Sequence, residues 1–573
     1  DGNDILIGDH GVIELEAREG IADLRLLDSQ RVISVHSTDP ASYGNNHLEV
    51  TGGRNILIGG SGNDTLQGGS GDDILIGDHG DVSFGRVNDV SDIVQIVVRD
   101  EGFDGDDIIE GGSGNDVLLG GGGNDILYGG TAENVDNAGN DILVGDFARL
   151  TFIDGQLRHL VTLPSARGGS DELHGGSGRN VLVGGEGGDF ITAGPSGNVN
   201  PFADPALLAS IVLGDHGELT WNGQGVLVHA TSRLDSDQGL TQEGLEARGS
   251  NDVVRLKGGH NIVLGGVGSD DIEIVQGGHA SRQIVLGDRG ELLWDENGVL
   301  RAAKSLDPAV GGNDTVRVES GDVVFIGGAG NDTLTISKAH FSSEHVVIGD
   351  NGRARWDESG VLRSLISLAP HVGGNDRIGI NAGFSAIIAG AGNDTVKTGD
   401  QSAVVLADLG ELTWNAAGFL TRATSTNPGL GGNDKVTVGN GGNLVIGGDG
   451  NNIIRSGDGH DLLAGDHAEA LYDDNGVIHS FTSLHFDYGG NDSIESGAGN
   501  DWIIGGHGND TISVASGDNV VLGDNGRILA RDGVRQRVES LDTRASTGGN
   551  DEIHVGTGND QVIAGVGNDH VTN

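Results

Sequence analysis

One nine-residue motif recurs along the chain and limits the folds that the chain can adopt. The segment "GGAGNDTLT" at 327–335 has the form G-G-x-G-x-D-x-U-x, where U is a large aliphatic residue. Its glycines allow positive φ and close backbone approach in a tight loop, and its aspartate places a carboxylate in that loop. The residues around U favour a short strand with one inward side chain. Two such halves make one 18-residue turn of a flattened parallel solenoid.

A Gly-Asp pair followed by a turn-like dipeptide sets a second, longer period. Its aspartates are separated by 69, 68, 69, 73, 62, 58, 58 and 58 residues, so the basic unit has 58 residues and the longer units carry insertions. Four nonapeptides account for 36 residues of a unit, which leaves 58 − 36 = 22 residues for a different element. We call the aspartates of these pairs the anchor aspartates: Asp9, Asp78, Asp146, Asp215, Asp288, Asp350, Asp408, Asp466 and Asp524.

The 22-residue element is predicted to be a β-hairpin. In "GELLWDENGVLRAAKSL" (290–306) and "GRARWDESGVLRSLISL" (352–368), alternating apolar residues flank a turn. Two solenoid turns and one two-stranded hairpin both span about 9.6 Å, so successive hairpins are expected to pair edge to edge. Aromatic residues six positions after the anchor aspartate either pack the hairpins onto the roll or form an exposed strip for a glycan or a neighbouring chain. They are Phe84, Phe152, Trp221, Trp294, Trp356, Trp414 and Tyr472.

The repeats predict an all-β fold: an elongated parallel β-roll or β-solenoid with 18-residue turns and a β-hairpin inserted about every two turns. We expect one continuous solenoid over residues 1–573. Because the chain opens in "DGNDILIGDHG", already inside the repeat, the expectation is a fragment of a longer array. The units are expected at roughly 9–77, 78–145, 146–214, 215–287, 288–349, 350–407, 408–465, 466–523 and 524–573.

The charge balance requires a partner for the acidic side chains. Acidic residues number 85 and basic residues 33, so the net charge is −52, and aromatic residues make up only 4%. A composition of this kind favours disorder unless the carboxylates are neutralised. It also argues against nucleic acid and anionic membranes as partners. The chain has no cysteine, which excludes disulfides and thiolate metal sites, and no apolar run of the roughly 20 residues that span a bilayer.

The sixth positions of the nonapeptides sort into two columns, because alternate nonapeptides stack on the same edge of the roll. Column A holds Asn46, Asp64, Asp107, Asp125, Asp171, Asp189, Asp252, Asp270, Asp314, Asp332, Asp376, Asp394, Asp434, Asn452, Asp492, Asp510, Asp551 and Asp569. Column B holds Asp4, Asn55, Asp73, Asp116, Asp141, Asn180, Ser210, Asn261, Gln283, Val323, His345, Ser385, Ala403, Asn443, Asp461, Asp501, Asn519 and Asp560.

The difference between the columns indicates a demand for charge on one edge. Column A has Asp at 16 of 18 positions, whereas column B has 7, none of them between residues 142 and 460. A local Asx-turn would favour Asp equally on both edges. Carboxylates stacked about 4.8 Å apart repel unless a cation lies between them, and Ca²⁺ suits such a site because it takes 6–8 oxygen ligands. The alternative is a cation-free solenoid with Asx-turns.

The column A aspartates are therefore the predicted calcium ligands. Column B aspartates Asp73, Asp116, Asp141, Asp461, Asp501 and Asp560 are candidates at the two ends of the chain. The anchor aspartates are open to two interpretations: extra calcium ligands, or caps where the chain leaves the roll for the hairpin.

The repeated G-G-x-G-x-D-x-U-x motif resembles the RTX (repeats-in-toxin) hemolysin-type calcium-binding β-roll, over roughly two-thirds of the chain. The resemblance implies Ca²⁺ bound between successive loops. It also implies an extracellular or cell-surface bacterial protein, exported by type I secretion, that folds when it meets calcium outside the cell. The regular hairpins depart from the plain roll.

No catalytic residues are expected. Most of the 20 histidines lie within the repeat, as in "GDHG" at 8–11 and 77–80, and a repeated His is more often a polar loop residue than a base. The Gly-rich loops lack the Lys of a P-loop. No set of Ser, His and carboxylate stands apart from the repeat.

These observations predict a structural, calcium-binding rod of an extracellular bacterial fibre, surface layer or giant adhesin that stiffens on binding Ca²⁺. Its expected partners are calcium ions and other copies of itself or neighbouring repeats end to end, with surface glycans as a further candidate. The alternatives are an accessory calcium module of a secreted enzyme or toxin, and a carbohydrate-binding rod that uses the hairpin aromatics.

Overall fold

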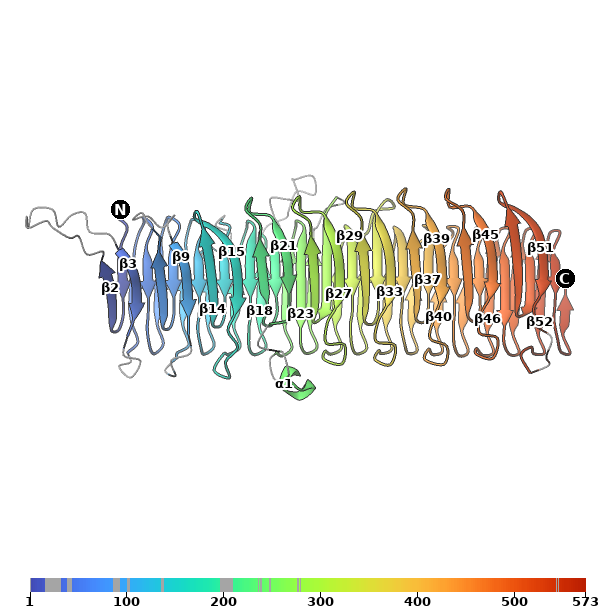
Figure 1. Ribbon diagram of the computed structural model, residues 1–573, viewed down its shortest axis with the longest axis horizontal. Coiled ribbons are helices and arrows are strands. Elements are labelled where there is room, and N and C mark those ends of the chain that lie inside the picture. Colours follow the sequence, from blue (N-terminus) through green and yellow to red (C-terminus); the bar gives the residue numbers. More distant parts are fainter. Residues whose placement is uncertain are drawn as a thin grey trace, which may run out of the picture. The chain divides into compact units, whose positions relative to one another are not determined.

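The computed structural model describes residues 2–15, 32–38, 44–85, 93–99, 102, 104–134, 139–195, 210–234, 237, 240–246, 249–275, 278, 280–542, 544 and 546–573. They form two compact units. Unit 1 comprises Asp1–Gly278 with Arg289–Gly298, and unit 2 comprises His279–Asp288 with Val299–Asn573. Apart from the short helix α1 (Gln242–Glu246), the regular elements of the described part are strands (Figure 1). The prediction of an all-β chain is confirmed.

Each unit contains strands of three kinds. Column A sheets consist of strands that start directly after a column A residue. Column B sheets consist of strands that start at or next to a column B residue. Hairpin sheets consist of the strands inserted between solenoid turns.

The strands of unit 1 are as follows. Its column A sheet has β4 (His47–Glu49), β6 (Thr65–Gln67), β10 (Ile108–Glu110), β12 (Ile126–Tyr128), β16 (Glu172–His174), β18 (Phe190–Ala193), β22 (Val253–Lys257) and β24 (Asp271–Val275). Its column B sheet has β1 (Ile5–Ile7), β5 (Ile56–Ile58), β7 (Ile74–Ile76), β11 (Val117–Leu119), β13 (Ile142–Val144), β17 (Asn180–Val183), β19 (Ser210–Leu213) and β23 (Asn261–Gly266). Its hairpin sheet has β2 (Gly11–Leu15), β3 (Val32–Ser37), β8 (Gly80–Phe84), β9 (Ile93–Val98), β14 (Ala148–Ile153), β15 (Gln156–Thr162), β20 (Glu218–Trp221), β21 (Leu227–Thr231) and β26 (Gly290–Trp294).

The strands of unit 2 follow the same plan. Its column A sheet has β28 (Thr315–Val318), β30 (Thr333–Ile336), β34 (Arg377–Ile380), β36 (Thr395–Lys397), β40 (Lys435–Thr437), β42 (Ile453–Arg455), β46 (Ser493–Ala498), β48 (Thr511–Ser516), β52 (Glu552–Thr557) and β54 (His570–Thr572). Its column B sheet has β25 (Arg282–Asp288), β29 (Asp322–Ile326), β31 (Glu344–Ile348), β35 (Phe384–Ile388), β37 (Ala403–Leu406), β41 (Leu444–Ile446), β43 (Leu462–Ala464), β47 (Trp502–Gly506), β49 (Val520–Asp524) and β53 (Gln561–Ile563). Its hairpin sheet has β27 (Leu300–Ser305), β32 (Gly352–Trp356), β33 (Leu362–Ser367), β38 (Gly410–Trp414), β39 (Leu420–Ser425), β44 (Ala468–Tyr472), β45 (Ile478–Ser483), β50 (Gly526–Arg531) and β51 (Val534–Ser540).

Parallel pairing stacks the nonapeptides in the expected register. In unit 2, β30 pairs with β28 and β34, and Arg377 of β34 lies opposite Thr395 of β36, one 18-residue turn later. The U residues of successive turns therefore lie above one another. Leu334 and Val396, at 1% exposure, are examples of U residues that form the core between the column A and column B sheets. The predicted parallel β-roll is confirmed within each unit.

The inserted hairpins join edge to edge, as expected from their width. In unit 2, β32 and β33 form a hairpin, and β33 pairs antiparallel with β38 of the next hairpin. In the hairpins of unit 2 that β32, β38, β44 and β50 begin, the register shifts directly before the position six residues after the anchor aspartate, for example between Arg355 and Trp356. A bulge of this kind re-aims a side chain. Trp356 is 7% exposed and, with Trp414, lines a cavity of about 480 Å³ beside the column B sheet, so the aromatic side packs towards the roll.

Glycine is required where the chain leaves the roll for the hairpin. A Cβ on Gly352, two residues after Asp350, would overlap the side chain of Ile348, and it would lie 2.9 Å from the carbonyl oxygen of Ile366. The glycine after the anchor dipeptide therefore reflects close approach of the hairpin to the last residue of the column B strand.

Candidate functional site

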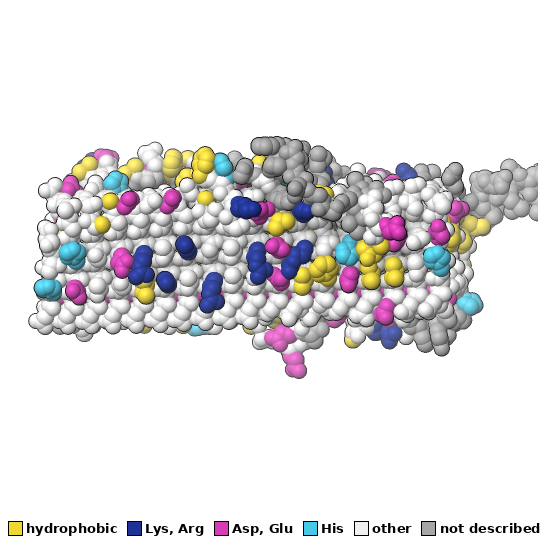
Figure 2. Space-filling view, turned by 180° about the vertical axis from the view of Figure 1, so that it is seen from behind, with side chains coloured by type: hydrophobic (Ala, Val, Ile, Leu, Met, Phe, Trp, Pro, Cys, Tyr) yellow, Lys and Arg dark blue, Asp and Glu magenta, His cyan; other side chains and the backbone are white. Residues whose placement is uncertain are grey.

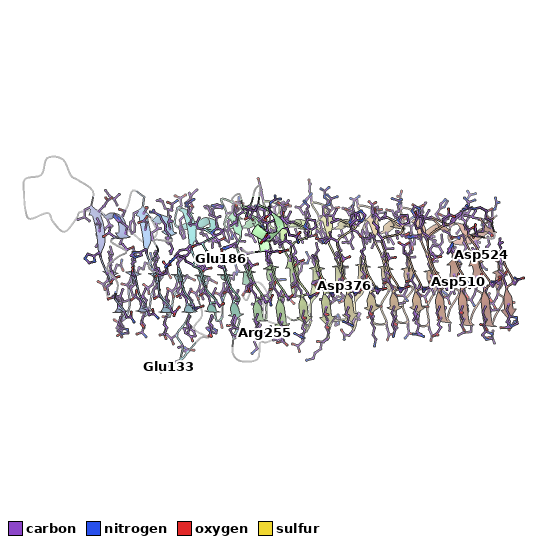
Figure 3. All side chains as sticks on the ribbon, turned by 90° about the horizontal axis from the view of Figure 1, so that it is seen from below. Glu133, Glu186, Arg255, Asp376, Asp510 and Asp524 are labelled. Atoms are coloured by element: carbon purple, nitrogen blue, oxygen red, sulfur yellow. The ribbon has the colours of Figure 1, made fainter. Side chains whose placement is uncertain are left out.

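The column A side chains form a hydrogen-bonded ladder along one edge of each unit. In unit 2, the backbone N–H of Asp314 donates to Oδ1 of Asp332, Asp332 donates to Asp376, and Asp376 donates to Asp394, at 2.7–2.8 Å. The same bond links the remaining column A residues of unit 2 as far as Asp569, and those of unit 1 from Asn46 to Asp270. In Figure 3, Asp376 and Asp510 lie along one line at this edge. The structure thus brings together the residues of column A within each unit.

The second carboxylate oxygen of these residues is buried and accepts no hydrogen bond. Asp376, for example, is 1% exposed, and its Oδ2 has no donor. A Cβ on Gly349 would overlap both this Oδ2 and the carbonyl oxygen of Ala389, so two oxygens meet in a space that only glycine leaves open. The column A residues whose Oδ2 lacks a donor in the described structure include Asp64, Asp107, Asp125, Asp171, Asp189, Asp332, Asp376, Asp394, Asp434, Asp492, Asp510 and Asp551.

The asparagine of column A in unit 2 shows what the missing partner has to supply. Asn452 has nearly the shape of Asp, and its backbone N–H and Oδ1 take part in the same ladder. Its Nδ2 donates to the carbonyl oxygens of Gly465 and Asp449, both at 3.1 Å. At the Asp positions an oxygen stands where this amide nitrogen stands, and it faces carbonyl oxygens. A bound cation, or a proton on the carboxyl, has to replace the amide hydrogens there.

The surroundings disfavour the ionised form of these carboxyls. Burial, followed by the charge of neighbouring aspartates, raises the pKa of Asp64 and of Asp551 from 3.8 to about 7. Burial also raises the pKa of Asp394 well above its ordinary value, and the charges of Asp434 and Asp376 add to the effect. A bound cation would reverse this balance, because it compensates both the lost hydration and the mutual repulsion.

Column B forms a similar ladder where it retains Asp and Asn. In unit 1 the N–H of Asp73 donates to Asp116, and that of Asp116 donates to Asp141; in unit 2, Asn443 donates to Asp461 and Asp461 donates to Asp501. Oδ2 of Asp73, Asp116, Asp141, Asp461 and Asp560 is buried without a donor, whereas Oδ2 of Asp501 accepts from the hydroxyl of Ser496. Burial raises the pKa of Asp116 to about 8.

In the central part of column B, the ladder positions hold side chains that need no cation. Val323 is fully buried, and Ala403 has no side-chain acceptor; its backbone N–H donates to Oδ1 of Asn443. The candidate metal positions of column B therefore lie near the two ends of the chain, as the sequence predicts.

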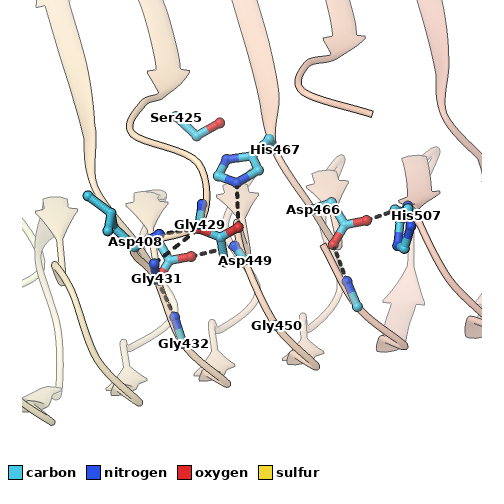
Figure 4. Close-up of polar contacts among 12 residues, drawn as sticks. Asp408, Ser425, Gly429, Gly431, Gly432, Asp449, Gly450, Asp466, His467 and His507 are labelled. Carbon is cyan, nitrogen blue, oxygen red and sulfur yellow. Dashed lines mark hydrogen bonds and ion pairs between the residues drawn. The ribbon is translucent and has the colours of Figure 1, made fainter. Parts of the chain in front are cut away.

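The anchor aspartates tie two successive column A loops to the base of a hairpin. Oδ1 of Asp350 accepts from the N–H of Gly374 at 2.9 Å, and its Oδ2 accepts from the N–H of Ala391. Figure 4 shows the equivalent bonds of Asp408 and Asp466. Asp9, Asp78, Asp146, Asp215, Asp288 and Asp524 likewise accept from backbone N–H groups. This geometry supports the interpretation of these residues as caps.

The same carboxylates also lie against column A. The pKa of Asp350 is raised well above its ordinary value, first by burial and then by the charge of Asp376; for Asp466, the charge of Asp492 acts in the same way. A cation at the column A position would interact with both carboxylates. The capping and ligand interpretations of the anchor aspartates are therefore compatible.

At several positions, the polar residue directly after the anchor aspartate makes buried contacts that the sequence pattern did not reveal. His79 bonds to the hydroxyls of Ser61 and Ser37 at 2.7 and 2.9 Å, and His467 lies 3.1 Å from Asp449 (Figure 4). Arg289 occupies the same position and pairs with Asp237. These side chains are buried between a column A loop and the hairpin base. The sequence feature that could have indicated these contacts is the His, Asn or Arg that repeatedly follows the anchor aspartate.

The Asn of the Gly-Asn-Asp triplet forms a second ladder that sequence reasoning missed. The N–H and Nδ2 groups of Asn375 donate to Oδ1 of Asn331, at 2.7 and 3.0 Å, and those of Asn393 donate to Asn375. This exposed ladder runs beside column A, so each loop holds the next through an amide as well as through a carboxylate.

The donor set of the column A positions fits a hard cation. In the described part of the chain, no three His, Asp or Glu side chains converge on one point. The oxygens that do converge are one or two carboxylates and loop carbonyls. Ca²⁺ accepts such a mixed shell of oxygens, whereas zinc and other softer metals favour nitrogen or sulfur ligands. The residues that would hold Ca²⁺ are the column A aspartates with the loop carbonyls beside them.

Comparison with known proteins agrees with this chemistry. No curated protein matches the chain. The family described as the RTX calcium-binding nonapeptide repeat (4 copies) matches it at residues 41–81, 101–136, 165–198, 245–273, 309–335, 428–463, 487–521 and 546–572. Such repeats are typical of secreted bacterial proteins. No helix in the described ranges is long and apolar enough to cross a membrane. RTX calcium-binding nonapeptide repeats are thus found across the chain, in these eight segments.

Proposed function

We propose that this chain is a calcium-folded structural segment of an extracellular bacterial fibre, surface layer or giant adhesin, and that it has no catalytic role of its own. The observation that carries this proposal is the unbroken column A ladder within each unit, in which most turns contribute a buried carboxylate oxygen without a donor. Function as a load-bearing element explains why the demand for a cation recurs along the ladder rather than being concentrated in one site.

Calcium acts in this proposal as the condition for folding. Without a cation, the ladder stacks buried carboxylates whose charges raise one another's pKa. Bound Ca²⁺ would be held by the column A aspartates and the loop carbonyls beside them, and it would stiffen the stack of turns. A chain that stays unfolded in low calcium and folds outside the cell suits type I secretion, which we propose as its export route. Other copies of the chain or neighbouring repeats, placed end to end, are the proposed partners.

A force measurement tests the mechanical part of the proposal. The full chain is stretched between two handles, first in Ca²⁺ and then in a chelator. We expect stepwise unfolding of folded turns in Ca²⁺ and featureless extension in the chelator. Equal unfolding forces in both conditions would contradict a calcium-stiffened structural role and would favour an accessory module whose ions serve another purpose.

A further inference from the structure

The outward face of the column A sheet in unit 2 carries a regular row of positive charges. Side chains alternate along a strand, so the residues on either side of each buried U residue point outwards. Register places Arg377, Thr395, Lys435 and Ile453 in one outward row, and Gly379, Lys397, Thr437 and Arg455 in the next. Figure 2 shows Lys and Arg side chains gathered on one flat face.

The charges form a zigzag with one cation on each of four consecutive strands. Arg377 is on β34, Lys397 on β36, Lys435 on β40 and Arg455 on β42, and they alternate between the two rows. Adjacent strands lie about 4.8 Å apart and two residues along a strand about 6.6 Å, so successive cations are about 8 Å apart. We call these four residues the cationic strip.

Most of the cationic strip has no counter-ion within the protein. Arg377, Lys397 and Lys435 are exposed, and within the described residues their side chains make no ion pair. Arg455 pairs with Glu495, with 2.8 Å between Nε and Oε2. On the corresponding face of unit 1, by contrast, Arg255 pairs with Asp271. Three neighbouring cations without an acidic partner are unexpected in a chain of net charge −52.

The side chains around the cationic strip exclude several kinds of ligand. The outward residues beside the U positions of this sheet include no Trp, Tyr or Phe, so bases of a single-stranded nucleic acid have nothing to stack on. A nucleic acid duplex carries one charge per about 1.7 Å of its axis, which four cations spaced about 8 Å apart on a flat face do not match. An added peptide strand needs a free sheet edge, but β34, β36 and β40 are paired on both sides. The remaining candidate ligand is an extended polyanion that lies across this flat face and presents single charges at intervals.

We propose that the cationic strip binds an acidic polysaccharide, through sulfate or carboxylate groups of successive sugars. Charge complementarity supplies the attraction, and the alternation of the four cations between two rows matches a polymer that crosses the strands and presents charges on alternate sides. Other outward positions of these strands and of the next one hold Thr and Ser, namely Thr395, Thr437 and Ser493, whose hydroxyls can bond to sugar hydroxyls. This surface would act on the folded, calcium-loaded chain, and it does not depend on the proposed fibre role.

The test compares two triple variants of the full chain in saturating Ca²⁺. The first, R377Q/K397Q/K435Q, removes the three uncompensated cations. The control, R355Q/R531Q/R537Q, removes three cations from the hairpin sheet of the same unit and changes the net charge equally. Binding to dextran sulfate and to hyaluronan is measured by surface plasmon resonance, with neutral dextran and duplex DNA as comparisons. Circular dichroism verifies that all variants fold.

The wild type and the control are expected to bind at least one of the two acidic polymers, more weakly as salt rises, and neutral dextran not at all. The strip variant is expected to bind about tenfold more weakly. A preference between dextran sulfate and hyaluronan would tell sulfate from carboxylate as the ligand group. The proposal is overturned if neither polymer binds, if the strip variant binds like the wild type, if the control loses as much affinity, or if duplex DNA binds as tightly as the acidic polysaccharides.

Discussion

The backbone N–H of Asp332 donates a hydrogen bond of 2.7 Å to Oδ1 of Asp376, and Oδ2 of Asp376 is left buried without a donor. The two residues are 44 positions apart because a hairpin lies between their turns. One oxygen therefore builds the stack of turns, and the other is available to a cation. The same arrangement recurs along column A. The side chains that hold the turns together therefore also offer oxygens to a calcium ion.

Replacing Asp376 by Asn should exchange a metal site for a hydrogen-bonded one. The variant keeps the Oδ1 acceptor, and its new amide can donate to loop carbonyls as Asn452 does to Gly465 and Asp449. In a chelator we expect D376N to be more stable than the wild type by about 1–3 kcal/mol, because a buried acceptor without a donor has been removed. In Ca²⁺ we expect weaker binding at this turn.

Isothermal titration calorimetry measures the calcium stoichiometry of D376N, and urea unfolding in chelator measures its stability. The substitution Glu358→Gln at an exposed position of the hairpin turn removes a charge but no candidate ligand, so it serves as the matched control. An unchanged calcium stoichiometry together with lower stability in the chelator would contradict the assignment of Asp376.

The metal-free chain should lose structure as the pH rises. Burial places the folded-state pKa of Asp64 and of Asp551 at about 7, above the ordinary value of 3.8. Because the folded form holds these protons more tightly than the unfolded form does, the stability is present at low pH and is lost as the pH rises from about 4 to about 7. In chelator we therefore expect more β-structure at pH 5.5 than at pH 8, as measured by circular dichroism.

Calcium should reverse this dependence, since protons compete with the ion for the same oxygens. The apparent calcium affinity is expected to rise between pH 5.5 and pH 8 and then to level off. A calcium affinity that is independent of pH across this range would show that the buried carboxyls are not the ligands.

Loss of an anchor aspartate should loosen two loops at once. In D350A the half-buried N–H groups of Gly374 and Ala391 lose their acceptor, at a cost of up to about 1–3 kcal/mol for each donor. Hydrogen exchange in saturating Ca²⁺ should show faster exchange at these two amides. The exposed hairpin substitution Glu358→Ala should leave both rates unchanged. If D350A exchanges at wild-type rates there, the capping role is wrong.

Trp356 is expected to stabilise the hairpin sheet through packing. It is 7% exposed and lies opposite Leu362 after the bulge in its hairpin. Truncation of a buried aromatic to Ala typically costs about 3–5 kcal/mol, so W356A should lower the urea midpoint of the loss of tertiary structure, as measured by near-UV circular dichroism in Ca²⁺. A stability equal to that of the wild type would favour the alternative role of the aromatics as a binding strip.

The fold and the two columns could be predicted because the nine-residue repeat determines on which edge of the roll each aspartate lies. A nine-residue period places Asp376 and Asp394, which are two nonapeptides apart, on one edge, and the width of a hairpin equals that of two turns. The sequence could not show which oxygen of each carboxylate is used for the ladder, because this depends on backbone positions in the neighbouring turn.

Two further features escaped the sequence pattern for the same reason. The buried contact between His467 and Asp449 joins residues 18 positions apart that meet only when turns stack. The bulge before Trp356 depends on one extra residue in the return strand, which alternation of apolar residues does not reveal. Local patterns determine each turn, whereas contacts between turns appear only in the assembled stack.

The most direct test of the account is a calcium titration of the metal-stripped full chain, followed by far-UV circular dichroism at pH 8 with Mg²⁺ as a control. The account predicts a chain with little β-structure in chelator, a cooperative gain of β-structure with Ca²⁺, and no such gain with Mg²⁺, which demands a more rigid octahedral shell. A chain that is already fully β-structured in chelator, and that Ca²⁺ leaves unchanged, would contradict it.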